Sequence, residues 1–564
     1  ADLCNARPVD EKRLPLVHSE GGSTFKMVSV LAALEAGTNF GQGWQADMLA
    51  AAEALGVALV RDGVSWSLVE RDGRFVYDEM RTTYPELLPD AGLALIFNVN
   101  NGHPDYDGGH TPVTQEAVAA FAAHAAEAVR RFPAIVAVEV GNEMNAENFV
   151  SGPGWDVDLA ERAVSYTRLL EATAKAVRAV RPEVRILGTA SHSLSLTWFR
   201  ALSDAGAFAH MDAIAVHPYD VPPEMLARKV AELRTVPGVG DMPLSITEIG
   251  DPDATSAPGH FLRTYCQLAL AGAETYVWYP LNPRGDGLVP LVTQSGDATG
   301  VGRAYALAAE HFEGRRVVPI APDPFTYGCR FGADAALLWG EPRDVSLHDA
   351  DIRALDATGA GLPRHGLALS RTKPIVLLAA DGAGLVPGRD YRLAPQPVIA
   401  DSYHQFSFDQ SDAALAGWQR VVRTPVSEAP MEARPGQQRG GVPWDPHLGT
   451  ALDGGTIADA RWVAGAMWGG GPVEVALRHR VGEAVRAELV VDAAPSTGAE
   501  VAPGLRIARG KSVLAEVEVA EPRRLRFGPF DLTSGEVVEV TLVPRDGRGG
   551  QFLSLRAQLR HAAD

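Results

Sequence analysis

The strongest constraint on the fold is a repeat of strand-like and helix-like segments through the first 315 or so residues. Short apolar, β-branched stretches alternate with amphipathic ones. A strand that is followed by a helix and another strand gives a parallel sheet. Eight such units within roughly 290 residues favour a closed (β/α)8 TIM barrel, so we predict an α/β barrel over residues 1–315. The eight strands are expected at 27–33, 57–61, 93–100, 135–141, 184–189, 213–217, 244–248 and 275–279.

The rest of the chain has a different sequence pattern. From about residue 316 the segments are short and alternating, and Gly and Pro interrupt them. This pattern is typical of all-β structure. We predict a small β domain over residues 316–394, packed on the barrel, and a β-sandwich or jelly-roll-like accessory domain over residues 395–564. Strands of the last domain are expected at 473–480, 486–492, 512–519 and 536–543.

Charge and hydropathy exclude several classes of protein. The 564 residues include 51 basic and 70 acidic side chains, which gives a net charge of −19. Such a charge argues against nucleic acid and anionic membranes as main partners. No apolar run is long enough for a membrane-spanning helix, so no membrane insertion is expected. The chain starts at Ala1, without Met. We interpret this start as a terminus left by signal cleavage or as an artificial boundary, and we expect a secreted or periplasmic protein.

Only three cysteines occur, at Cys4, Cys266 and Cys329. Three are too few for a disulfide scaffold, and their spacing is not that of a metal site. Cys266 lies in an apolar helical stretch, so we expect a buried free thiol there. Cys4 and Cys329 can pair if the compartment is oxidising.

Polar residues gather where the predicted barrel strands end. The carboxyl ends of all strands in a (β/α)8 barrel meet at one mouth, which is where such enzymes carry their active sites. Two carboxylates stand there, Glu143 after the fourth strand and Glu248 at the end of the seventh. The side chains around them are Arg61, Asn98, Asn142, His217, Tyr219 and Trp278.

Two carboxylates at one mouth suit glycoside hydrolysis. One carboxylic acid protonates the leaving oxygen, and a second carboxylate about 5–5.5 Å away attacks the anomeric carbon in retaining enzymes. An arginine keeps the nucleophile ionised. The acid needs a raised pKa to be protonated near neutral pH. We expect Glu143 and Glu248 to be this pair.

The motifs resemble those of retaining clan A glycoside hydrolases, most closely family 39 and its bacterial exopolysaccharide-cleaving relatives. The resemblance rests on Asn142-Glu143, on Glu248, on Arg61, on the pair His217 and Tyr219, and on Trp278. A further match is the stretch from Trp66 to Glu70. The resemblance covers about residues 25–315. Family 39 commonly has Trp before the Asn-Glu pair and Pro after it, whereas this chain has Gly141 and Met144.

The resemblance implies a role for each of these residues. Glu143 is implied to be the acid/base and Glu248 the nucleophile, and Asn142 is implied to bind the sugar's 2-hydroxyl. Arg61, His217, Tyr219 and a Trp278 sugar platform complete the implied substrate site, and we add Asn98 because it stands at the end of the third strand. The expected partner is an oligo- or polysaccharide, without a cofactor. We expect no metal, because neither His-x-His after the first strand nor His-Glu-x-x-His occurs.

Simpler interpretations stay open for these residues. Arg61 can be only an ion-pair partner of Glu139, and Trp278 can be a core aromatic. His192, Asn100 and His103 are weaker candidates for the site. Three other functions also remain: a transglycosylase using the same site, a non-catalytic carbohydrate-binding protein, and a structural surface protein. Trp418, Trp444, Trp462 and Trp468 of the last domain are compatible with sugar stacking but also with a core.

Overall fold

The computed structural model describes most of the chain. The described residues are 33–38, 40–43, 46–100, 102–348, 351–380, 384–411, 417–438, 442–450, 456–468, 471–496, 501–545 and 551–562. Two compact units are present. The first comprises Ala1–Ile320 and Tyr327–Arg392, and the second comprises Ala321–Thr326 and Leu393–Asp564.

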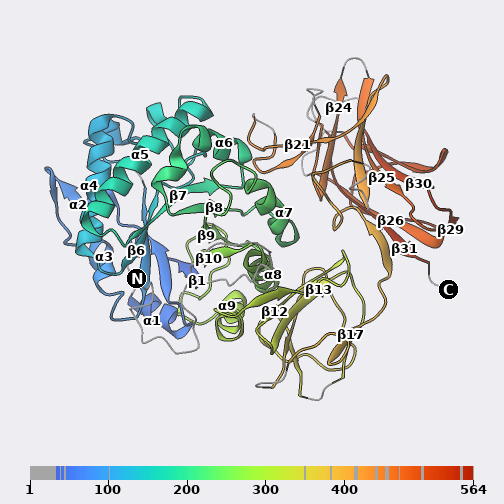
Figure 1. Cartoon of the computed structure of the whole chain (residues 1–564), viewed down its shortest axis with the longest axis horizontal. Coiled ribbons are helices and arrows are strands. Elements are labelled where there is room, and N and C mark those ends of the chain that lie inside the picture. The colour runs from blue at the N-terminus through green and yellow to red at the C-terminus, as the bar shows by residue number, and fades with distance from the viewer. Residues whose placement is uncertain are drawn as a thin grey trace, which may run out of the picture. The chain divides into compact units, whose positions relative to one another are not determined.

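A closed barrel of eight parallel strands forms the centre of the first unit (Figure 1). Its strands follow one another around the barrel in chain order, and β1 closes it by pairing with both β2 and β10. This confirms the predicted (β/α)8 barrel. The strands are β1 (Ala33–Gly37), β2 (Leu59–Asp62), β5 (Ala94–Val99), β6 (Ile135–Val140), β7 (Arg185–His192), β8 (Ala213–His217), β9 (Leu244–Ile249) and β10 (Ala273–Trp278).

The first strand lies later in the chain than the sequence predicted. It was expected at 27–33, whereas β1 runs over Ala33–Gly37, and residues 27–32 lie outside the described part of the chain. The segment Leu34–Gly37 pairs with β10 or β2 and is apolar apart from Glu35. Apolar residues continue on both sides of residue 33, so composition alone does not fix where this strand begins.

Helices surround the barrel and cover the outer faces of its strands, while side chains fill its interior. All five residues of β8 are buried, as expected for a strand covered on both faces. Several helices begin at side chains that accept a backbone N–H: Thr114, Asp158, Ser195 and Thr299. The helices are α1 (Ala46–Ala54), α2 (Trp66–Val69), α3 (Met80–Thr83), α4 (Gln115–Arg131), α5 (Leu159–Val180), α6 (Leu196–Asp204), α7 (Pro223–Leu233), α8 (Ala257–Leu270) and α9 (Gly300–His311).

A small antiparallel sheet follows α9 and belongs to the same compact unit. Its order is β11-β12-β13-β16-β15, and it packs against α8, where Tyr265 meets Phe331 with ring centroids 5.6 Å apart. β14 and β17 pair with each other and form a separate two-stranded sheet. The strands are β11 (Val317–Pro319), β12 (Thr326–Phe331), β13 (Ala335–Gly340), β14 (Val345–Leu347), β15 (Arg353–Leu355), β16 (Ile375–Leu378) and β17 (Tyr391–Leu393).

A disulfide joins the barrel to this small sheet. It links Cys266 of α8 to Cys329 of β12. The expectation of a free thiol at Cys266, and of a possible Cys4–Cys329 bond, was therefore wrong for the described cysteines. The cause is tertiary: α8 packs directly on the sheet, which brings together two cysteines 63 residues apart. Cys4 lies outside the described residues.

The second unit is antiparallel β structure, which confirms the predicted β-rich carboxyl-terminal region. Strand β24 pairs with both β25 and β31, and so connects two groups of strands. Trp418 is fully buried, whereas Trp462 is 38% exposed. The strands include β18 (Val398–Asp401), β19 (Trp418–Arg423), β24 (Trp462–Trp468), β25 (Gly471–Arg480), β26 (Val485–Pro495), β27 (Gly504–Arg509), β28 (Ser512–Glu518), β29 (Arg523–Leu532), β30 (Val537–Val543) and β31 (Gln551–His561).

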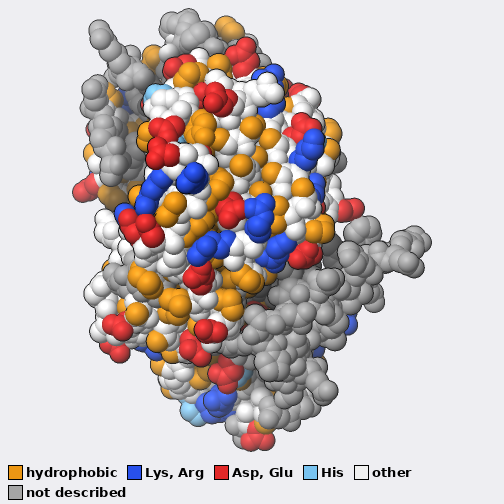
Figure 2. All heavy atoms as spheres, turned by 90° about the vertical axis from the view of Figure 1, so that its left-hand side faces the viewer, with side chains coloured by type: hydrophobic (Ala, Val, Ile, Leu, Met, Phe, Trp, Pro, Cys, Tyr) orange, Lys and Arg blue, Asp and Glu red, His pale blue; other side chains and the backbone are white. Residues whose placement is uncertain are grey.

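The surface is mixed in character on the side seen in Figure 2. Acidic, basic and hydrophobic side chains are interspersed there rather than gathered by kind. On that face the basic side chains do not form the continuous patch by which proteins hold a phosphate backbone. Among the described residues, no helix combines the length and the apolar character needed to cross a bilayer.

Candidate active site

The predicted carboxylates both lie at the carboxyl ends of barrel strands. Glu248 is the penultimate residue of β9, and Glu143 follows β6 by three positions. His217 ends β8, between them in the barrel order. Because these three strands point the same way, their last residues share one mouth, and a single buried imidazole contacts both carboxylates.

Two donors hold Glu248 from opposite oxygens. Arg61 donates from Nη1 to Oε2 across 3.1 Å, and the hydroxyl of Tyr219 donates to Oε1 across 2.8 Å. Burial, together with the charge of Glu248, raises the pKa of Tyr219, so its hydroxyl remains a donor. Each carboxylate oxygen of Glu248, the residue expected to act as nucleophile, therefore accepts a hydrogen bond.

Arg61 also anchors the residues behind the site. Its Nε donates to Oε2 of Glu139 across 2.5 Å, and its Nη2 donates to Oδ1 of Asn142 across 2.7 Å. Asn98 donates to the same Glu139 oxygen across 2.9 Å. Burial opposes the charge of Glu139, but Arg61, His217 and Thr247 together lower the pKa of Glu139 to about 2. Both interpretations of Arg61 therefore describe contacts that are present: it pairs with Glu139 and donates to Glu248.

Two histidines contact Glu143. His217 lies 3.0 Å from Oε1 through Nδ1, and His192 lies 3.3 Å from Oε2, also through Nδ1. Burial works against the charge of Glu143, but the hydrogen bonds to both imidazoles prevail and lower its pKa to about 2. This differs from the raised pKa that the acid role requires. The sequence did not show it, because neither imidazole is adjacent to Glu143 in the chain.

His217 is the central residue of the cluster. Its side chain is fully buried, and its Nε2 lies 3.1 Å from the Thr247 hydroxyl oxygen. Burial opposes the imidazolium, but Glu248, Glu139 and Glu143 together raise the pKa of His217 to about 9. The three carboxylates around His217 therefore favour its imidazolium form.

The same nitrogen limits the separation of the two carboxylates. Nδ1 of His217 is 3.0 Å from Oε1 of Glu143 and 3.8 Å from Oε2 of Glu248. Those two oxygens can be no farther apart than the sum of these distances, about 6.8 Å. This limit is compatible with the retaining separation of about 5–5.5 Å between the two carboxyl groups.

The backbone around Glu143 is held in unusual conformations. Glu143 has a φ of 45°, and its N–H donates to the carbonyl of Ala190 across 2.6 Å. Gly141 has a φ of 81°, and a Cβ there would lie 2.6 Å from the Met144 side chain. Positive φ angles at non-glycine residues cluster at functional sites, where surrounding structure maintains them. Here they turn the chain so that Glu143 faces β7 and β8.

Trp278 does not reach the cluster. It is fully buried, its ring packs against Phe261 of α8 at a centroid distance of 5.6 Å, and its indole N–H donates to the carbonyl of Val289. The expected sugar platform at Trp278 was therefore wrong, and the core interpretation holds. The neighbouring Tyr279 packs against Gly37 at the end of β1, and burial raises the pKa of Tyr279.

The stretch from Trp66 to Glu70 follows β2 and contacts the loop after β5. Trp66 is fully buried and donates to Oε2 of Glu70, whose other oxygen accepts the hydroxyl of Tyr106 across 2.7 Å. His103 contacts the backbone carbonyl of Glu70. These contacts bind the segment after β2 to the loop after β5 and give it a structural role.

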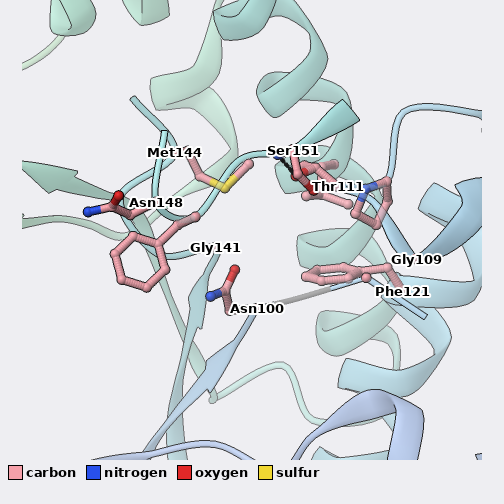
Figure 3. Close-up of a pocket in the computed structure, with 12 residues that line it drawn as sticks. Asn100, Gly109, Thr111, Phe121, Gly141, Met144, Asn148 and Ser151 are labelled. Atoms are coloured by element: carbon pink, nitrogen blue, oxygen red, sulfur yellow. Dashed lines mark hydrogen bonds between the residues drawn. The ribbon is translucent and has the colours of Figure 1, made fainter. Parts of the chain in front are cut away.

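A pocket of about 210 Å³ lies beside the turn that carries Glu143 (Figure 3). Asn100, at the end of β5, points into it, and Met144 and Asn148 form one side. On the opposite side the N–H of Ser151 donates to Thr111 across 2.9 Å. The lining residues are Asn100, Gly102, Gly109, Thr111, Pro112, Phe121, Gly141, Met144, Asn148, Phe149, Ser151 and Leu169.

Comparison with solved structures identifies the fold. A family 39 glycoside hydrolase from the gut symbiont Bacteroides cellulosilyticus WH2 superimposes with a TM-score of 0.52 at 17% identity, covering 62% of this chain and 81% of that one. The chain thus has the fold of a family 39-like clan A glycoside hydrolase. Neither a protein-family model nor a curated protein matches the sequence.

Two further structures are similar over the same share of the chain. A family 39 β-xylosidase from Caulobacter crescentus has a TM-score of 0.46 at 17% identity, covering 63% of this chain and 98% of that one. A family 30 endoxylanase from Clostridium papyrosolvens C71 has a TM-score of 0.47 at 13% identity, with the same coverage.

Proposed function

We propose that the protein is a retaining glycoside hydrolase that cleaves an oligo- or polysaccharide by double displacement. The observation that carries the proposal is the contact of one imidazole, His217, with both Glu143 and Glu248. It brings two carboxylates from different strands within the reach of one glycosidic bond. The family 39-like fold supports the same reaction class.

In the first step, Oε1 or Oε2 of Glu248 attacks the anomeric carbon while the acid form of Glu143 protonates the leaving oxygen. The glycosidic C–O bond breaks, and an ester between sugar and Glu248 forms. In the second step, Glu143 as carboxylate takes a proton from water, and the water oxygen displaces Glu248 from the sugar. The configuration is inverted twice and is therefore retained.

The residues around the pair have distinct tasks. Arg61 and Tyr219 stabilise the carboxylate of Glu248 before attack and when it leaves. Asn142, fixed by Arg61 through Oδ1, presents its amide N–H2 to a sugar hydroxyl, and Asn98 supports the position of Glu139. The pocket beside Met144 lies next to the acid/base turn, where the leaving group would be held.

A secreted or periplasmic location belongs to the same proposal. The Cys266–Cys329 disulfide supports it, because structural disulfides persist in oxidising compartments. The shared site also suits transglycosylation, in which a second sugar replaces water in the second step. Product analysis with and without an added acceptor sugar separates the two reactions.

Azide rescue tests the proposal. Glu248→Ala should abolish turnover of aryl glycosides, and azide should restore formation of a glycosyl azide of inverted configuration, because azide fills the space of the lost carboxylate. Wild-type product should keep the substrate's anomeric configuration in NMR spectra taken early in the reaction. Glu310→Ala, on the exposed surface of α9, is the matched control. Full activity in Glu248→Ala would contradict the mechanism, and a wild-type enzyme with no activity on any glycoside would favour a binding protein.

A further inference from the structure

The chain places His192 at the second oxygen of Glu143. His192 is the last residue of β7, its Nδ1 lies 3.3 Å from Oε2 of Glu143, and its side chain is 38% exposed. His217 contacts the other oxygen, Oε1. We propose that His192 and Glu143 form a proton-sharing dyad, in which His192 supplies the proton that Glu143 gives to the leaving oxygen. This inference rests on the proposed function.

The backbone is built to bring His192 to this position. The side chain of Asn145, fully buried, holds His192 at two points: its Nδ2 donates to the His192 carbonyl across 3.0 Å, and its Oδ1 accepts the His192 N–H across 2.9 Å. The N–H of Glu143 donates to Ala190, two residues before His192. The acid/base turn and the end of β7 are therefore locked together by three hydrogen bonds.

An irregularity in β7 turns His192 toward Glu143. The register between β7 and β8 shifts between Gly188 and Ser191. Thr189, Ala190 and Ser193 have φ angles of 79°, 35° and 58°. Such bulges and positive φ angles re-aim side chains beside active sites, where the surrounding structure maintains them.

The charges around His192 decide which histidine can give up a proton. His192 is faced by Glu143 from the β6 turn, by His217 from β8 and by Asp220 just after β8. The hydrogen bond to Glu143 raises the pKa of His192, and burial opposes it. His217 is fully buried among Glu139, Glu143 and Glu248, which hold its proton. The half-buried His192 is thus the one that can exchange a proton with solvent.

Substrate binding would move the proton within the dyad. In the open site the dyad is an ion pair, with imidazolium at His192 and carboxylate at Glu143. A sugar that covers the pair removes water from it, and low polarity favours the neutral forms of both groups. The proton then passes from Nδ1 of His192 to Oε2 of Glu143 and on to the leaving oxygen. In the second step, Glu143 takes a proton from water and passes it back to His192. The pair therefore ends the reaction with the same number of protons as at the start.

The dyad makes a pH prediction that a structural role does not. As long as one proton remains on the pair, it can move to Glu143 and make the neutral acid. Activity should therefore persist up to the pH at which His192 loses its proton, above the ordinary histidine pKa of about 6.5. Without His192, the alkaline limb of kcat/KM for substrates with poor leaving groups should move to lower pH. If His192 only holds Glu143 ionised, its removal should move that limb to higher pH.

The experiment compares His192→Asn with His192→Ala. An Asn amide lies near the position of Nδ1 and keeps a hydrogen bond to Glu143, but it cannot supply the proton. We expect kcat/KM at pH 7 on an alkyl glycoside to fall about 10²-fold in both variants, and on a dinitrophenyl glycoside to change by less than about 5-fold, since good leaving groups need little protonation. His365→Asn, on an exposed loop of the small β region, is the control.

The outcomes separate this inference from the proposed function. An alkaline limb displaced to lower pH in both variants supports the dyad. Wild-type activity and pH profile in His192→Asn, with loss only in His192→Ala, would show a positioning residue and overturn the dyad alone. If circular dichroism shows that either variant folds poorly, the pH profiles of kcat/KM for the wild-type enzyme provide the test instead. The dyad requires that activity on the alkyl glycoside falls only above about pH 6.5, and that activity on the dinitrophenyl glycoside shows no such fall. A wild-type chain without glycosidase activity would overturn the proposed function itself.

Discussion

The hydroxyl of Tyr219 donates to Oε1 of Glu248 across 2.8 Å, on the opposite side of the carboxylate from Arg61. A hydrogen bond to a charged group contributes about 1.5–3 kcal/mol. Tyr219→Phe should therefore lower kcat/KM by about 10- to 100-fold, with the fold unchanged. Steady-state kinetics on an aryl glycoside measures this loss. Tyr391→Phe, in the small β region, should stay within about 2-fold of wild type, and an equal loss there would point to a general effect on folding.

Glu143→Ala should separate substrates by their leaving groups. Removing the acid should cost about 10²–10⁴-fold in kcat/KM for alkyl glycosides, but little in the first step for dinitrophenyl glycosides. The second step, which needs the base, should then limit turnover and produce a burst of dinitrophenol in stopped-flow records. Glu147→Ala, at an exposed position four residues along the same turn, is the control. Equal losses on both substrates would contradict the acid role of Glu143.

The interaction between Glu143 and His217 should make stability depend on pH. The pKa of His217 is raised to about 9, so its contribution is fully present below its ordinary pKa of about 6.5 and is lost as the pH rises to 9. The pKa of Glu143 is lowered to about 2, so its contribution is present above about 4.5 and is lost as the pH falls toward 2. Both shifts describe partly the same contact, so their free energies are not added.

We therefore expect the melting temperature of the barrel unit to be highest near pH 5–6.5. Between pH 6.5 and 9 the folded state should lose about 3 kcal/mol, the equivalent of the shift at His217. Calorimetry at pH 6 and pH 9 measures this difference. His217→Asn should be less stable than wild type at pH 6 and show a smaller change between the two pH values. A wild-type stability that is constant up to pH 9 would contradict a protonated His217.

Trp278 and Tyr279 should differ in what their substitution changes. Trp278→Phe should lower stability by roughly 1–3 kcal/mol, because it removes buried contacts with Phe261 and the donor to Val289, and should leave KM nearly unchanged. Tyr279→Ala should raise KM several-fold, since its ring packs on Gly37 beside the site and offers an aromatic face to sugar. Kinetics and urea unfolding on the same preparations test both. A raised KM in Trp278→Phe would restore the platform role to Trp278.

The barrel and its mouth were predictable because the signals are local. Each strand and helix has its own apolar pattern, and parallel strands bring their last residues to one mouth whatever the details of packing. That rule alone placed Arg61, His217 and Glu248 together. It needs only the order of the strands.

The parts that failed depend on tertiary structure. In β10 both faces are covered, so residue type does not tell which side of the barrel Trp278 faces. The position of His192 depends on a bulge in β7 that no sequence signal marks. The lowered pKa of Glu143 arises from two imidazoles 49 and 74 residues away in the chain. The cysteine pairing required the packing of α8 on the small sheet.

The Cys266–Cys329 bond gives the last prediction. It closes a loop of 63 residues between α8 and β12, and closing a loop of that length in the unfolded chain corresponds to about 4 kcal/mol. Cys266→Ala, Cys329→Ala and the double variant should each lower the free energy of unfolding by about 2–4 kcal/mol, and by the same amount, because each breaks the same bond. Calorimetry with and without reductant measures the effect. Thiol titration in denaturant fixes the pairing: with Cys4 as the third cysteine, Cys266→Ala should show two free thiols. A Cys266→Ala chain that shows no free thiol and melts like wild type would mean that Cys4 and Cys329 are bonded instead.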